Sequence, residues 1–250
     1  MKNSITLIKK EYLEYLRNHK LFILSTVFII MGIMNPLIAK MTPWLIEQFV
    51  NDIPIQIPEP SIIDSWIQFF KNIGQIALII FVIMFSNCIN LEITQGTLIN
   101  LLTKGLKRHA VIISKFVSLS LLWSSLYLIS ALITWAYNYY YFSGTIDNLP
   151  IALLTLWLFG IFIIALIILG NVLIKNNYGG LLIVGLFMIM GLFFNGFNIL
   201  NDYNPVILFT SSNTIMTNST ITCMPNIIIT IILTIFALIS TIIIFNHQEV

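Results

Sequence analysis

The sequence predicts an all-α membrane protein with six transmembrane helices, and two observations predict it. Hydrophobic residues make up 58% of the 250 residues and charged residues only 9%, against about 25% charged residues in an ordinary soluble domain. Uncharged apolar stretches also recur along the whole chain, each near the length of about 20 residues that crosses a bilayer. So few charged groups exclude a soluble globular protein, and the chain has room for one transmembrane domain without a further soluble one.

Six stretches account for the predicted spans. None of them contains Asp, Glu, Lys or Arg, as expected because a charge at the bilayer centre is strongly unfavourable. The predicted transmembrane helices cover residues 21–39, 73–91, 116–141, 151–174, 179–200 and 226–245. The long segment between the first two spans is predicted to form either a small outer cap or a collar that rests on the membrane, with an interfacial helix near 62–70. Residues 201–225 are consistent with a re-entrant piece.

The basic residues predict the orientation of these spans. Ten of the twelve Lys and Arg residues lie in the amino-terminal segment, the loop after the second span and the loop after the fourth. Only Lys40 and Lys71 lie on the other side. Because an excess of Lys and Arg marks cytoplasmic loops, both termini are predicted to be cytoplasmic. The chain is therefore expected to cross a membrane several times.

The amino-terminal segment 4–18 predicts an amphipathic helix that lies in the membrane interface. Its apolar residues recur at helical spacing and form one stripe, while most of its charged residues lie elsewhere. The stripe consists of Ile5, Ile8, Tyr12, Tyr15 and Leu16. Two roles are open for this helix: an anchor that only sets the topology, or a lever that joins a cytoplasmic partner to the first span.

The loop after the second span predicts a short cytoplasmic helix over 97–104. Thr97 is a favourable N-cap, and Gly105 suits the residue that ends a helix. The leucines between them form one face, and an exposed apolar face with a polar rim usually marks a partner site. The alternative is a helix that lies flat on lipid. The residues expected to contact a partner are Glu92, Gly96, Thr97, Leu98, Leu101, Leu102, Lys107 and Arg108.

The sequence lacks the motifs of an enzyme. No Gly-Lys dipeptide is present, so the phosphate-binding loop of nucleotide hydrolases cannot form. No HExxH or CxxC pattern offers metal ligands, and we expect no catalytic residue, cofactor or metal in this chain. Asparagines within the spans either bond helices together or line a path. The candidate path-lining residues are Asn87, Asn90, Asn195 and Asn198.

These patterns together resemble the ABC type-2 transporter permease family. Members of this family often read E-x-x-x-GT-L-x-x-LL after the second span, followed by a turn with Pro and Arg and then by Lys. Here the same positions are filled by Glu92, Gly96, Thr97, Leu98, Leu101 and Leu102, and then by Lys107, Arg108 and Lys115. The segment 103–106 departs from the family because it lacks the Pro of that turn. The resemblance covers the whole six-span layout, including an amphipathic helix before the first span.

The resemblance implies which protein subunits this chain binds in the membrane and in the cytoplasm. Two permeases, identical or paralogous, pair in the membrane, and two separate ATPase subunits that bind ATP and Mg²⁺ dock beneath them. The 97–104 helix inserts into a groove of the ATPase, and Glu92 fixes that loop at the base of the second span. The substrate path runs mainly between the second and fifth spans of the two copies. No nucleic acid is an expected partner, whereas membrane lipid is.

The resemblance also implies a multi-pass protein of a bacterial cytoplasmic membrane, and it bears on the substrate. Small Ile-rich permeases of this type are similar to those by which Gram-positive bacteria export antimicrobial or cytolytic peptides, such as the phenol-soluble modulin exporters of staphylococci. An uncharged apolar lining suits amphipathic peptides or lipophilic compounds better than ions or sugars. The alternative from another class is an ATPase-independent membrane channel or a toxin-immunity protein.

Overall fold

The computed structural model describes residues 2–49, 59–98, 103, 105–196, 203–217 and 223–248, and over these residues the chain is helical, without strands. Five of its helices are long and apolar enough to cross a membrane: Lys20–Ile46, Ile62–Thr94, Arg108–Tyr141, Leu149–Leu173 and Met224–His247. This confirms an all-helical chain with several candidate spans. A sixth apolar helix, α9 (Gly179–Phe194), has 16 residues, and the predicted span 179–200 extends into residues outside the described part.

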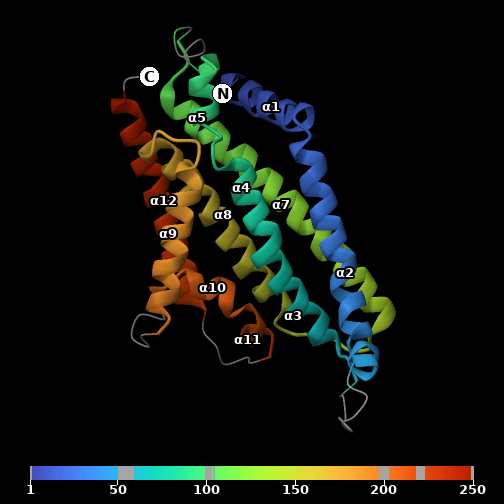
Figure 1. The fold of residues 1–250 in the computed structure, drawn as a ribbon. Helices are drawn as coiled ribbons and strands as arrows, with labels where there is room; N and C mark the ends of the chain where they lie inside the picture. Colours follow the sequence, from blue (N-terminus) through green and yellow to red (C-terminus); the bar gives the residue numbers. More distant parts are fainter. Residues whose placement is uncertain are drawn as a thin grey trace.

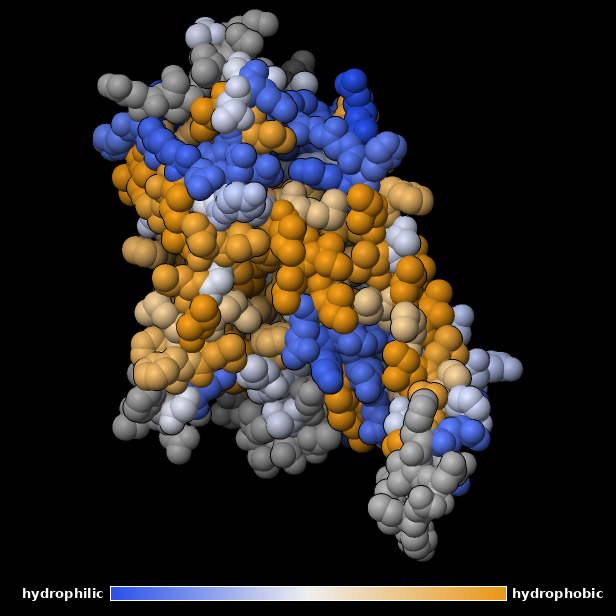
Figure 2. All heavy atoms as spheres, in the orientation of Figure 1, coloured by the Kyte–Doolittle hydropathy of each residue, from blue (hydrophilic) through white to orange (hydrophobic). Residues whose placement is uncertain are grey.

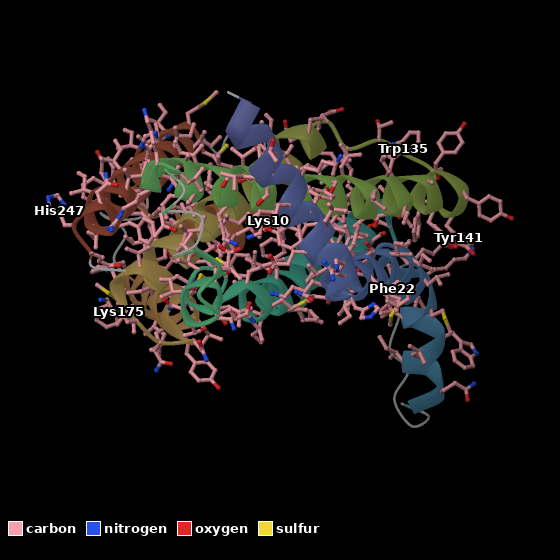
Figure 3. The ribbon with its side chains drawn as sticks, turned by 90° about the horizontal axis from the view of Figure 1, so that it is seen from above. Lys10, Phe22, Trp135, Tyr141, Lys175 and His247 are labelled. Carbon is pink, nitrogen blue, oxygen red and sulfur yellow. The ribbon has the colours of Figure 1, made fainter. Side chains whose placement is uncertain are left out.

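The first two helices meet at a sharp turn. α1 (Lys2–Arg17) lies across one end of the bundle, and α2 (Lys20–Phe49) descends from it (Figures 1 and 3). His19 makes the turn with a φ of 56°, a left-handed conformation in which His is enriched among the residues with a side chain. The end of α12 (Met224–His247) lies at the same end of the bundle as α1 (Figure 1).

The first long helix does not end with the predicted span at residue 39. α2 continues through Pro36 and Pro43. Proline removes the hydrogen bond to the carbonyl four residues earlier, which for Pro36 is that of Gly32. The Thr134 hydroxyl from α7 (Arg108–Tyr141) donates to that Gly32 carbonyl at 3.0 Å. A neighbouring helix therefore supplies the missing partner, as membrane helices with proline require.

The second span begins earlier than predicted, within the segment assigned to a separate interfacial helix. α3 (Ile62–Asn72), the π-helical turn η1 (Ile73–Ala77) and α4 (Leu78–Phe85) run on without interruption. Ser61 and Asp64 form a capping box at the start, which satisfies two free amide groups. No Gly or Pro lies between residues 61 and 73 to end the helix, so it continues into the apolar stretch.

The second span is then interrupted at residues 86–89, before α5 (Asn90–Thr94). The freed backbone groups find partners on the helices behind. Asn171 of α8 (Leu149–Leu173) donates to the Ser86 carbonyl at 2.7 Å and accepts from the Ile89 amide at 3.3 Å. The Gly180 amide of α9 donates to the same Ser86 carbonyl at 3.2 Å. The interruption is thus a fixed structural feature.

α8 is the central helix of the bundle. It packs against α7, α9 and α12, and most of its residues are buried. Two short helices, α10 (Val206–Thr210) and α11 (Ser212–Thr217), lie at the end opposite α1 and contact α8 (Figure 1). They occupy the segment in which we expected a re-entrant piece.

We predict that Gly180→Ala destabilises the protein. A Cβ atom at this position would lie 2.8 Å from the Ser86 carbonyl oxygen and 2.9 Å from the Asn171 amide nitrogen, so the clamp on the interrupted span would have to shift, typically at a cost of about 1–3 kcal/mol. Gly185→Ala on the same helix is the matched control, because a Cβ there meets nothing within 4 Å. Thermal melting in detergent should show a lower midpoint for the first variant alone, and equal midpoints would contradict the clamp.

Candidate functional site

Three helices meet in a cluster of charged side chains at the α1 end of the bundle. The Lys115 ammonium of α7 lies 2.7 Å from Glu11 Oε2 of α1 and 3.0 Å from Glu92 Oε1 of α5. The Lys10 ammonium of α1 donates to the same Glu92 oxygen at 2.6 Å. We call Lys10, Glu11, Glu92 and Lys115 the charge cluster. It ties together elements that are up to 104 residues apart in the sequence.

The charge cluster is almost entirely withdrawn from solvent. The side chains of Glu11, Glu92 and Lys115 are 4%, 5% and 3% exposed, whereas Lys10 is 38% exposed at its edge. Two carboxylates face two ammonium groups, so the formal charges balance. Burial raises the pKa of the Glu11 carboxyl above its ordinary value, and Lys115 opposes this shift only in part. The cluster is therefore a buried ion-pair network whose members depend on one another.

Lysine ammonium groups lie against the acidic side chains of the cluster. Carboxylate oxygens of Glu11, Glu14 and Glu92 lie within 4.8 Å of one another, a spacing that three metal ligands show. Lys115 and Lys10 already place ammonium groups against these oxygens. The lysines occupy the positions that a cation would take, and the arrangement joins helices.

The structure buries part of the stripe that the sequence predicts for the amino-terminal helix. Tyr15 is buried against Ser118 and Phe85, but Leu16 is 52% exposed. Ile8 and Tyr12 are half-buried, and the Ile5 side chain lies outside the described part of the structure. The buried face includes Glu11, which sequence reasoning missed. Its spacing of three from Ile8 and four from Tyr15 was the available signal.

The residues predicted to contact a partner have different surroundings in the structure. Gly96 has a φ of 69° and turns the chain, after which the Thr97 hydroxyl donates to the Glu92 carbonyl at 3.2 Å. Leu98 is fully buried, so it does not present its side chain to a partner in this structure. Leu101 and Leu102 lie outside the described residues, as does Lys104 of the predicted 97–104 helix.

The last two residues predicted to contact a partner follow this loop. Lys107 is exposed. The Arg108 guanidinium donates to the carbonyls of Phe245, Asn246 and Gln248. It therefore caps the carboxyl end of α12, where a cation also favours the helix dipole. This contact joins the start of α7 to the end of the last helix.

The predicted path-lining asparagines bond mainly to the fold. Asn90 donates to the Ile174 and Asn176 carbonyls at 3.2 and 2.7 Å. The side-chain Oδ1 of Asn195 accepts from Asn204 Nδ2 at 2.8 Å. Asn87 is half-buried, and Asn198 lies outside the described residues.

A polar stripe that the sequence reading did not identify follows one face of the second span. Asp64, Lys71 and Gln75 are exposed and Gln68 is half-buried, at spacings of four, three and four residues. Such spacings place side chains on one helix face. Figure 2 shows this hydrophilic patch over α3 and η1, interrupting a surface that is otherwise largely hydrophobic. We call these four residues the polar stripe.

We predict that Lys115→Met destabilises the folded protein by about 3–5 kcal/mol, because removing one partner of a buried ion pair leaves charges without compensation. Glu11 and Glu92 would face each other with only Lys10 nearby. Lys107→Met removes an exposed ammonium from the same region and should leave the unfolding midpoint unchanged. Denaturation in detergent measures both, and a wild-type midpoint for Lys115→Met would contradict the role of the cluster.

The raised pKa of Glu11 predicts a pH dependence with a definite sign. As the pH falls, the Glu11 carboxyl is protonated at a higher pH in the folded protein than in the unfolded chain. The stability that this difference contributes is fully present below the ordinary carboxyl pKa. It is lost as the pH rises through the raised pKa of the folded state. The melting temperature of wild type relative to Glu11→Gln should therefore fall over that pH interval. Glu14→Gln, at a side chain 30% exposed, is the control and should follow wild type throughout.

Comparison with known proteins adds no relative: no family model matches this sequence, and no curated protein matches it.

Proposed function

We propose that the chain is the membrane-spanning permease subunit of an ATP-driven exporter, with six spans and both termini in the cytoplasm. The observation that carries the proposal is the charge cluster. It joins the amino-terminal helix to the second and third spans at the end of the bundle that carries the basic loops. In the family that the sequence resembles, a separate ATPase that binds ATP and Mg²⁺ docks at that end.

The cluster is suited to pass movement from a docked subunit into the membrane. Glu92 lies four residues before Gly96, and its backbone carbonyl accepts from Thr97 at the start of the loop. Its side chain is paired with Lys10 of α1 and Lys115 of α7. A displacement of the loop therefore acts on three helices at once. Coupling of this kind is what the lever role for the amino-terminal helix requires.

An open hollow beside the cluster supports a docking surface. It has a volume of about 560 Å³ and lies between α1 and the segment at α5, lined by Lys10, Leu13, Glu14, Arg17, Asn18, Leu91 and Gln95. Leu13 is 50% exposed. Apolar side chains rimmed by charged ones are typical of surfaces that bind a partner. A cytoplasmic subunit seated here would contact both the amino-terminal helix and the base of the second span.

The polar stripe supports a path through the membrane. Charged and amide groups on the outside of a membrane helix are unfavourable against lipid, so they face a watery cavity or another protein chain. α9, which lies beside the α3–α4 helix in Figure 1, exposes an apolar stripe of Leu182, Leu186, Ile189 and Phe193. A second permease covering both stripes would enclose a path with polar and apolar walls. Such walls suit an amphipathic peptide as substrate.

The proposal is tested by purification of tagged wild type and of a variant with Leu101→Asp and Leu102→Asp. We expect a separate ATPase to co-purify with wild type in stoichiometric amount and to be lost from the variant, because the charges prevent insertion of the loop helix into an apolar groove. His109→Asp adds a charge at an exposed position beyond the same loop and should retain the ATPase. Mass spectrometry identifies the partners. Wild type without an ATPase, even after cross-linking, would refute the exporter and favour a channel or immunity protein.

A further inference from the structure

A neutral pocket lies at the end of α7 opposite the charge cluster. It has a volume of about 320 Å³ and is bounded by the start of α3, the end of α7, the start of α8 and the segment between α7 and α8. Besides apolar residues, its lining includes Trp66, Trp135, Asn138, Tyr139, Gly144 and Thr145. No charged residue is among the described residues that line it. The proposed exporter mechanism makes no use of this pocket.

Three buried polar atoms at this pocket have no hydrogen-bond partner among the described residues. They are Oδ1 and Nδ2 of Asn138 and Nε1 of Trp66. Both side chains are 1% exposed, and a buried polar group left unpaired costs about 1–3 kcal/mol. Asn138 offers both donors and an acceptor, and the Trp66 indole offers one donor. A ligand that pairs with all of these atoms would have to both accept and donate hydrogen bonds.

An apolar strip on the outside of α7 leads to the pocket. Leu128, Leu132 and Trp135 are 57%, 55% and 56% exposed, and their spacings of four and three residues place them on one helix face. The strip ends at Tyr139, which is 81% exposed and lines the pocket. Figure 3 shows Trp135 and Tyr141 near the end of α7, at the edge of the molecule. An acyl chain lying on this strip would bring its headgroup to the pocket.

We propose that the pocket binds a membrane lipid through the hydroxyl groups of its headgroup. A hydroxyl group both donates and accepts, which matches the carboxamide of Asn138 and the indole of Trp66. The neutral lining does not favour recognition by charge. The aromatic rings of Trp135 and Tyr139 would pack against the carbon atoms of a glycerol or sugar. The unpaired atoms have almost no exposed surface, so side chains at the pocket have to move to admit the hydroxyl group.

The test measures melting temperatures in lipid nanodiscs of three compositions: phosphatidylcholine alone, and the same lipid mixed with phosphatidylglycerol or with glucosyl diacylglycerol. Phosphatidylcholine has no headgroup hydroxyl and is the reference. A lipid that binds the folded state raises its melting temperature, so at least one hydroxylated lipid should raise that of wild type by a few degrees. The two mixtures distinguish a glycerol headgroup from a sugar headgroup as the source of the hydroxyls.

Two variants locate the effect at the pocket. Asn138→Leu and Trp66→Phe should lose the lipid-dependent rise, whereas Tyr140→Phe, at a neighbouring residue 82% exposed that does not line the pocket, should keep it. In phosphatidylcholine alone, Asn138→Leu should melt no lower than wild type, because it removes an unpaired buried amide. The proposal fails if wild type shows no rise with either lipid, or if the rise persists in both pocket variants. Should Asn138→Leu not fold, Trp66→Phe decides alone.

Discussion

The buried ammonium of Lys115 fixes how the amino-terminal half of this molecule is assembled. Two carboxylates, from Glu11 and Glu92, are held in an interior where neither would remain ionised without a cation. Lys115 contacts both, so α1 must lie against α7 and α5 must end beside them. The orientation of α1 across the end of the bundle follows from this constraint. The main effect of the ion pairs is to select one arrangement of the three helices. Their net contribution to the free energy of unfolding, relative to an apolar replacement, is small.

Polar side chains elsewhere in the bundle replace missing backbone partners. Asn171 serves the interruption at residues 86–89, and Thr134 serves the carbonyl that Pro36 leaves free. Asn90 holds the turn between α8 and α9 through the Ile174 and Asn176 carbonyls. Lipid offers the backbone no alternative hydrogen bonds, so each irregularity in a span needs such a residue nearby. The sequence left open whether asparagines within the spans line a substrate path or bond helices together. In the structure, Asn90 and Asn171 hydrogen-bond backbone groups of neighbouring segments.

The sequence predicts where the apolar segments lie better than where the helices begin and end. Absence of charge located the centre of each span, because an isolated charge is strongly unfavourable in lipid. By that criterion the third span starts just after Lys115, yet α7 begins seven residues before Lys115, at Arg108. Lys115 is buried because two carboxylates from distant segments meet it, and no local pattern shows that pairing. Glu11 was missed because hydrophobicity alone placed it outside the stripe, although its spacing from Ile8 and Tyr15 puts it on the same helix face.

At the π-helical turn, two segments far apart in the sequence pack together beside the polar stripe. Within η1, a Cβ at Gly74 would lie 2.2 Å from the ring of Phe209 in α10, so only glycine allows α10 to pack so closely there. Gln75, the next residue, is exposed on the outside. π-helical turns within membrane helices often accompany functional positions because they alter the direction of the side chains that follow. The close packing of Phe209 on Gly74 thus lies directly beside Gln75, a residue of the polar stripe, so a side chain larger than glycine at position 74 would disturb the backbone on which the stripe depends.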